Sequence, residues 1–130
     1  MWVGSNFYYT VDTPAAKAFV RAYTAKYAGP PGYAPAAAYG MTRLVLRAIE
    51  KAGSTEVPDV IRALEGLEVD DLVGRMLVDP RTHQTLRPYF FMRCKSRAEM
   101  KDPLDFADII ATGTTPQPSE LNECTDIGSV

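Results

Sequence analysis

Apolar residues recur at helical spacing in three segments of the first half of the chain. The first helix is predicted to begin at Pro14, after a capping residue at Asp12 or Thr13, because proline suits the first helical position. The run Gly29-Pro30-Pro31-Gly32 is expected to end this helix, since proline cannot donate to the helical ladder. Its apolar stripe consists of Phe19, Val20, Tyr23 and Tyr27.

The second predicted helix has the most regular pattern and ends before Gly53, where a left-handed residue commonly closes a helix. A third helix is expected to start after a cap at Ser54 or Thr55 and to end near Gly66. The connection between the two helices is very short, which predicts that they pack side by side. The expected apolar face of the second helix comprises Ala34, Ala37, Ala38, Met41, Leu44, Val45, Ala48, Ile49 and Ala52, and that of the third comprises Val57, Val60, Ile61 and Leu64.

Alternating and β-prone patterns predict strands at the start of the chain and in its second half. The aromatic run Trp2–Thr10 predicts an opening strand that leads into a loop. Gly74–Val78 and Pro88–Lys95 predict two further strands, which we expect to pair as a hairpin across the turn-rich loop Asp79–Gln84. Aromatic residues on both faces at the start of the second of these strands predict that it is well buried.

The C-terminal part is expected to hold a polar loop at residues 95–102, a short helix at Asp105–Ala111 and a surface tail. The domain is therefore predicted to span residues 1–111, with the Thr-, Pro-, Ser- and Gly-rich residues 112–130 as the tail. Three amphipathic helices need more sheet than three strands provide. The predicted fold class is thus α/β, with helices packed on a short partial sheet of a larger protein or of an oligomer.

Composition is that of an ordinary globular protein of one domain at most. Of the 130 residues, 46% are apolar and 23% charged, which argues against disorder. The formal net charge of −2 indicates no basic surface for nucleic acid or anionic membranes. The longest apolar stretch, near Tyr39–Ile49, is interrupted by Arg43 and Arg47, so no segment is expected to span a bilayer. The first residues do not show the pattern of a signal peptide.

The sequence contains no recognisable catalytic, phosphate-binding or zinc motif, so neither an enzyme nor a cofactor is expected. The single histidine, His83, lies in a predicted loop without a nearby nucleophile, and a hydrogen-bonded loop histidine is the favoured interpretation. Asp105 and Asp108 share a face of the predicted short helix, where weak binding of a hard cation is the alternative, but a solvated surface is favoured for all the carboxylates. The carboxylates concerned are Asp70, Asp71, Asp102, Asp105 and Asp108.

Two further features leave alternatives open. Tyr33 directly precedes the alanine-rich start of the second helix, where free N–H groups attract a carboxylate, so Tyr33 is either a pocket wall or a packing residue. Cys94 and Cys124 would close a loop of roughly 30 residues as a disulfide, worth on the order of 3 kcal/mol in the chain-entropy model. Cys94 is otherwise a buried strand residue.

The order of these segments resembles the branched-chain amino-acid-binding proteins, which are type I periplasmic solute-binding proteins of ABC transporters. No single segment is diagnostic, but the ordered set is specific and covers about residues 1–111. It corresponds to the C-terminal segment of these two-lobed proteins. The matching segments are Phe7–Tyr9, Phe19–Tyr27, Tyr33–Tyr39, Ala48–Ser54 (AIEKAGS), Val60–Gly66, Gly74–Pro80, His83-Gln84, Pro88–Phe90 and Lys101–Phe106.

The resemblance implies an extracytoplasmic, periplasmic protein that binds an amino acid or a related aromatic or aliphatic carboxylate without chemistry. Lobe closure around this ligand would be read by the ABC permease. The ligand-binding residues implied are Tyr8, Tyr33 and Ala34. The alternative is a ligand-sensing domain of a receptor or regulator with the same fold. A partial sheet with exposed edges and apolar helix faces also predicts a homodimer.

Overall fold

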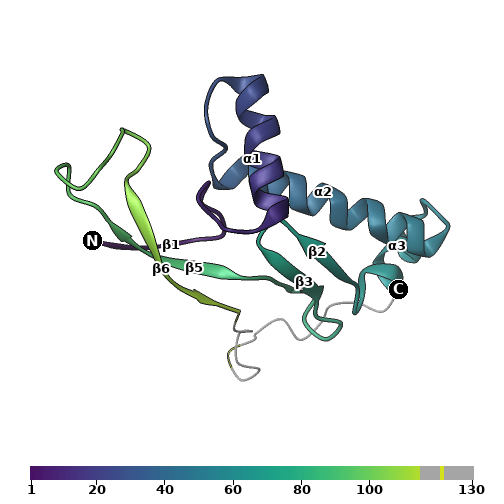
Figure 1. Ribbon diagram of the computed structural model, residues 1–130. Coiled ribbons are helices and arrows are strands. Elements are labelled where there is room, and N and C mark those ends of the chain that lie inside the picture. The colour runs from purple at the N-terminus through teal and green to yellow at the C-terminus, as the bar shows by residue number, and fades with distance from the viewer. Residues whose placement is uncertain (115–120, 122–130) are drawn as a thin grey trace.

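A computed structural model of the protein describes residues 1–114 and 121. These residues form a mixed α/β structure in which α1 and α2 lie above the strands in the view of Figure 1. The elements in chain order are β1 (Trp2–Ser5), α1 (Pro14–Tyr27), α2 (Tyr33–Ala52), α3 (Val57–Leu64), β2 (Glu68–Asp71), β3 (Gly74–Val78), β4 (Thr85–Leu86), β5 (Tyr89–Cys94) and β6 (Ala107–Gly113).

The start of α1 is fixed by Thr13, which decides between the two capping candidates. Thr13 Oγ1 accepts a hydrogen bond from Ala16 N at 3.0 Å and donates one to Leu72 O at 2.6 Å. Asp12 instead pairs with Lys17 on the surface. The same hydroxyl thus caps the helix and ties it to the turn between β2 and β3.

The helices α2 and α3 pack side by side, as their short connection predicts. Gly53 has a φ of 62° and closes α2 as a left-handed residue, as expected. The predicted cap of α3 at Ser54 or Thr55 is wrong, because Glu56 occupies the N-cap position. Ser54 Oγ accepts from Glu56 N at 3.1 Å and so stabilises the connecting turn instead.

The buried face of α2 is rotated from the predicted one. Ala34, Ala38 and Val45 are exposed, contrary to expectation. A prediction from periodicity places the large apolar residues on the buried face. In this helix, however, most of the buried residues are small. The residues that are buried lie four apart and are Ala36, Gly40, Leu44 and Ala48. On α3, likewise, Val57 is exposed and the small Ala63 is buried.

The strands form two antiparallel three-stranded sheets, in the orders β1-β5-β6 and β2-β3-β4. The predicted hairpin of β3 with β5 is therefore wrong. The two-residue strand β4 occupies the edge beside β3, with Leu86 opposite Leu77. Pro88 has no N–H with which to continue that pairing. The chain then crosses to the other sheet, where β5 pairs with β1 and β6.

Two further predictions about the second half are wrong. In β5 the burial alternates, with Phe90 and Met92 buried and Tyr89 and Phe91 exposed, so only one face is covered. The segment predicted as a helix at Asp105–Ala111 is largely strand β6, because its backbone finds partners on β5. This strand extends to Gly113, and the predicted tail beyond residue 114 lies outside the described residues except for Leu121.

The turn between β2 and β3 joins the two halves of the molecule. Its residues Leu72 and Val73 are buried in the core formed by α1, the start of α2 and the β1-β5-β6 sheet. A second, smaller core lies under the rest of α2 and contains Leu44, Met76 and Val78. The β2–β3 hairpin thus belongs to the second core through its strands and to the first through its tip.

A buried ion pair lies beside this turn. Arg87 Nη2, in the link from β4 to β5, is 2.7 Å from Asp71 Oδ2 at the end of β2. Only 9% of the arginine side chain and 1% of the aspartate side chain are exposed. The prediction that Asp71 lies on a solvated face is therefore wrong. A methyl group at Gly40 would come within 2.7 Å of Asp71 Oδ1, so only glycine lets α2 pass this close.

Several large apolar side chains remain exposed on the described surface, among them Val45 and Leu46 of α2. The homodimer expected from such faces stays a prediction. Among the described residues, none of the helices is long and apolar enough to cross a membrane.

We predict that Arg87→Ala lowers the free energy of unfolding by about 3–5 kcal/mol, because it leaves the buried Asp71 carboxylate without its partner. The control is Arg75→Ala, which removes a pair with Glu68 whose side chains are 70% and 43% exposed. That loss should be about 1 kcal/mol or less. Urea denaturation of both variants measures the difference, and equal losses would contradict this role for the buried pair.

Candidate functional site

A cavity of about 360 Å³ opens between the end of β1, the loop before α2 and the loop between β5 and β6. The described part of its wall contains no charged side chain and is mostly apolar. Tyr8 and Tyr33 both line it, whereas Ala34 does not. The lining residues are Val3, Gly4, Ser5, Phe7, Tyr8, Tyr9, Pro30, Pro31, Gly32, Tyr33, Met92, Leu104 and Phe106.

The buried tyrosine Tyr8 connects the segment that follows β1 to the loop between β5 and β6, and both belong to the wall. Its hydroxyl donates to Leu104 O at 2.8 Å. Its ring packs edge-on against Phe106, with 5.0 Å between ring centroids, and against Tyr9 at 4.8 Å. Such edge-to-face contacts add specific geometry to the burial of aromatic surface. Tyr8 therefore fixes the position of the β5–β6 loop over the cavity.

The phenol of Tyr9, which also lines the wall, stays neutral over the physiological pH range. Burial raises the pKa of Tyr9 to about 12, and the neighbouring Tyr8 adds to this shift. A protonated phenol can donate a hydrogen bond to a solute and brings no negative charge that would repel a carboxylate.

The N-terminus of α2 meets the cavity at Gly32 and Tyr33. Gly32 is the N-cap residue, and no side-chain cap satisfies the first turn. This turn also contains no acidic residue. Because the first N–H groups of a helix lack intrahelical partners and carry a partial positive charge, they attract an anion. The cavity thus combines an aromatic wall with the uncapped N-terminus of a helix.

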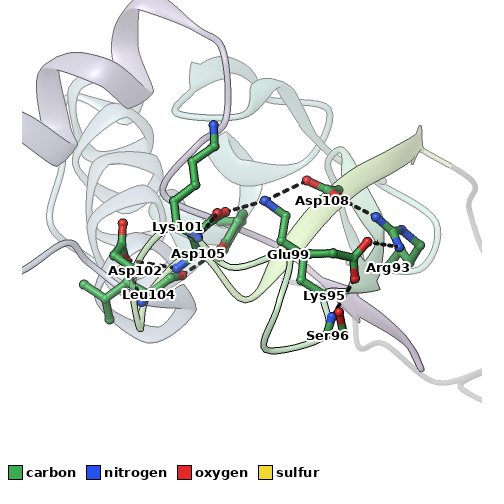
Figure 2. Close-up of polar contacts among 10 residues, drawn as sticks. Arg93, Lys95, Ser96, Glu99, Lys101, Asp102, Leu104, Asp105 and Asp108 are labelled. Carbon is green, nitrogen blue, oxygen red and sulfur yellow. Dashed lines mark hydrogen bonds and ion pairs between the residues drawn. The ribbon is translucent and has the colours of Figure 1, made fainter.

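An ionic network organises the loop of residues 95–106 that closes one side of the cavity. Figure 2 shows Lys95 between Asp105 and Asp108, and Arg93 between Asp108 and Glu99. Lys95 Nζ lies 2.5 Å from Asp105 Oδ1 and 3.1 Å from Asp108 Oδ1. The prediction that Asp105 and Asp108 share a helical face is therefore wrong, because Asp108 lies in a strand and a lysine lies between the two carboxylates. The favoured solvated surface is also wrong for Asp105, which is only 9% exposed.

These contacts shift the pKa values of the groups concerned. Hydrogen bonding to Lys95 lowers the pKa of Asp105 and of Asp108, and the two carboxylates raise the pKa of Lys95 in return. The N–H of Ser96 donates to Glu99 Oε2 at 2.7 Å and, with the Ser96 hydroxyl and Arg93, lowers the pKa of Glu99 to about 2. All the carboxylates of the network are consequently ionised at neutral pH.

The other chemical candidates of the sequence lie away from the cavity. His83, a loop residue with a φ of 54°, has its Nε2 3.0 Å from Glu65 Oε1, so its interpretation as a hydrogen-bonded loop histidine is confirmed. No group of three or more potential metal ligands occurs among the described residues. Cys94 lies half-buried in β5, and Cys124 lies outside the described residues, so their disulfide stays a prediction.

The sequence analysis did not identify the part of the wall that comes from the loop between β5 and β6. Leu104 and Phe106 flank Asp105, which is an alternating pattern that continues into the strand β6. Given the strand period, these two apolar side chains are expected on one side of the backbone and the aspartate on the other. Because a helix was predicted over this segment, the alternation was not interpreted as a strand pattern.

The chain was compared with protein families and known structures. The family model for periplasmic binding proteins matches residues 1–99. No curated protein matches the chain. The amino acid ABC transporter substrate-binding protein of Pseudomonas fluorescens Pf-5 is similar with a TM-score of 0.84 and 27% identity, over 95% of this chain and 33% of that one.

Two other solved structures share the fold. A solute-binding protein of an ABC transporter from Rhodopseudomonas palustris BisB5, in complex with 3,4-dihydroxybenzoic acid, has a TM-score of 0.77 at 19% identity over 92% of this chain and 32% of that one. The leucine-, isoleucine-, valine-, threonine- and alanine-binding protein of Brucella ovis has a TM-score of 0.73 at 22% identity. The match covers 87% of this chain and 30% of that one. The chain thus spans about a third of the length of these proteins.

We predict that Glu99→Gln flattens the dependence of stability on acid pH. The pKa of Glu99 is lowered in the folded protein from its ordinary 4.5 to about 2. Its carboxylate therefore stabilises the fold above pH 4.5, and this contribution is lost as the pH falls to about 2. Urea denaturation at several pH values between 5 and 2 should show a smaller decline for the variant than for the wild type.

The matched control is Ser96→Ala, which removes the hydroxyl but keeps the N–H that contributes most to the lowered pKa of Glu99. It should retain most of the wild-type decline. Parallel curves for the wild type and Glu99→Gln would show that this carboxylate is not held as described.

Proposed function

This chain belongs to the periplasmic binding protein family, and we propose that it forms part of the solute-binding component of an ABC importer. In this proposal it binds a small carboxylate without changing it chemically. The observation that carries the proposal is the uncharged, aromatic cavity at the uncapped N-terminus of α2. Such a concave, mostly apolar wall with a few polar groups is typical of small-molecule sites.

The proposed solute is an aromatic carboxylate of the benzoate class. Its ring would lie against the aromatic wall, and its carboxylate would accept from the first N–H groups of α2. Gly32 and Tyr33, which line the cavity at this N-terminus, would supply these N–H groups, while Tyr8 and Tyr33 contribute their rings. Among structures with this fold, two were solved with 3,4-dihydroxybenzoic acid and p-hydroxybenzoic acid bound.

An α-amino acid fits this part of the site less well. Its ammonium group would lose water on binding and would need an acidic partner, because an unpaired buried charge is costly. No acidic side chain belongs to the lining described here. The aromatic acid is therefore favoured over the amino acid, although proteins with this fold bind both kinds of solute.

The remaining wall of the site would come from the rest of a two-lobed domain, since the chain spans about a third of the similar structures. Closure of the two lobes around the solute is then the signal that the permease recognises. This function places the protein in the periplasm, where the solute is captured before import.

We predict that p-hydroxybenzoate raises the melting temperature of the chain in a dose-dependent way, because a ligand of the folded state stabilises it. The neutral isostere p-hydroxybenzamide and the amino acid leucine should give smaller shifts. Differential scanning fluorimetry measures all three, at ligand concentrations up to the millimolar range.

The matched variants are Tyr33→Ala, which removes a ring from the wall, and Tyr27→Ala, which removes an exposed ring of α1 that does not line the cavity. Tyr33→Ala should reduce the shift, and Tyr27→Ala should preserve it. A larger shift with leucine than with p-hydroxybenzoate would contradict the solute class. No shift with any carboxylate would contradict the site itself.

A further inference from the structure

Two apolar residues of the cavity wall are held where no hydrophobic core covers them. Leu104 and Phe106 lie in the loop between β5 and β6, and their exposed fractions are 48% and 45%. Tyr8 contacts both residues, through a hydrogen bond to Leu104 O and through ring packing on Phe106. A second interaction, beside that of Tyr8, holds this part of the wall in place.

The residue between them supplies that interaction. Asp105 is 9% exposed, although it is an ionised residue in a surface loop. Its Oδ1 contacts Lys95 Nζ at 2.5 Å, and its Oδ2 accepts from Lys101 N at 3.0 Å. The side chains of Lys95 and Asp105 are only 12% and 13% exposed, so solvent screens their attraction less than that of the surface pairs.

Lys95 anchors this interaction to the sheet. It directly follows β5, and its backbone N–H donates to Phe106 O at 2.8 Å. Its Nζ also reaches Asp108 on β6, which Figure 2 shows beside Arg93. One lysine therefore holds the wall residue Phe106 through its backbone and the central Asp105 through its side chain.

We propose that Lys95 and Asp105 form a clasp that positions the Leu104–Phe106 side of the cavity for the solute. The two are positioning residues, since neither lines the cavity. This inference rests on the proposed function. A clasped loop is ordered before the solute arrives, so binding does not have to order it, and affinity rises accordingly.

The test combines hydrogen exchange with solute binding in the wild type and in Lys95→Met, which keeps the length of the side chain but removes its charge. In the variant, the amides of Lys101, Leu104 and Asp105 should exchange roughly tenfold faster or more, because the turn loses its charged anchor. Affinity for p-hydroxybenzoate, measured by isothermal titration calorimetry, should fall roughly tenfold. Exchange in β1 and α2 should stay unchanged.

Two further variants separate the clasp from general stabilisation. Asp105→Asn is nearly isosteric and should reproduce both effects of Lys95→Met. Lys17→Met is the matched control, because Lys17 and Asp12 also approach to 2.5 Å but are 69% and 84% exposed. It should leave exchange in the loop and solute affinity as in the wild type.

The proposal is overturned if Lys95→Met and Asp105→Asn both keep the wild-type exchange in the loop. It is equally overturned if exchange rises to the same extent throughout the chain, or if the loop loosens while affinity stays the same. If the wild type itself does not bind p-hydroxybenzoate, the proposed function fails. The exchange measurement then still decides whether Lys95 and Asp105 hold the loop.

Discussion

The buried ion pair between Asp71 and Arg87 is the contact on which the arrangement of the molecule depends. Asp71 ends β2 and faces Gly40 of α2, while Arg87 begins the crossing to the other sheet. Helix α2, the β2–β3 hairpin and the chain segment that leads to the β1-β5-β6 sheet therefore meet at one charged contact. Because a buried charge is tolerated only with its partner, this contact permits few alternative arrangements of the three.

The turn next to this ion pair connects it to the cavity. Leu72, next to Asp71, accepts from the hydroxyl that caps α1 and packs in the same core as Phe7 and Tyr8. The position of Tyr8 in turn sets the loop between β5 and β6 through its bond to Leu104. The connection from the ion pair to the wall thus runs through adjacent residues, a shared core and one hydrogen bond, so a binding surface can form on a fold with little regular sheet.

Local signals in the sequence were sufficient to predict the three helices and the strands β1, β3 and β5. They were not sufficient to predict β2, β4 and β6 or the pairing of the strands. Proline and glycine fixed the start of α1 and the end of α2, since their backbone preferences act within a few residues. The partner of β5 is β1, at the other end of the chain, and no local pattern reports such a pairing. Periodicity also failed to identify the buried Asp71, because burial there depends on a distant arginine.

The candidate site was predictable only in part. Tyr8 was identified through a family resemblance and Tyr33 also through its position before the alanine-rich helix start, and both line one cavity. The loop that carries Leu104 and Phe106 was missed because a helix was predicted there. The most direct measurement of the central claim is the set of intermolecular NOEs between p-hydroxybenzoate and the chain. The account predicts contacts from the aromatic ring of the solute to Tyr8, Tyr33 and Phe106. Contacts instead to Met41 and Ile61, which line a separate cavity between α2 and α3, would contradict it.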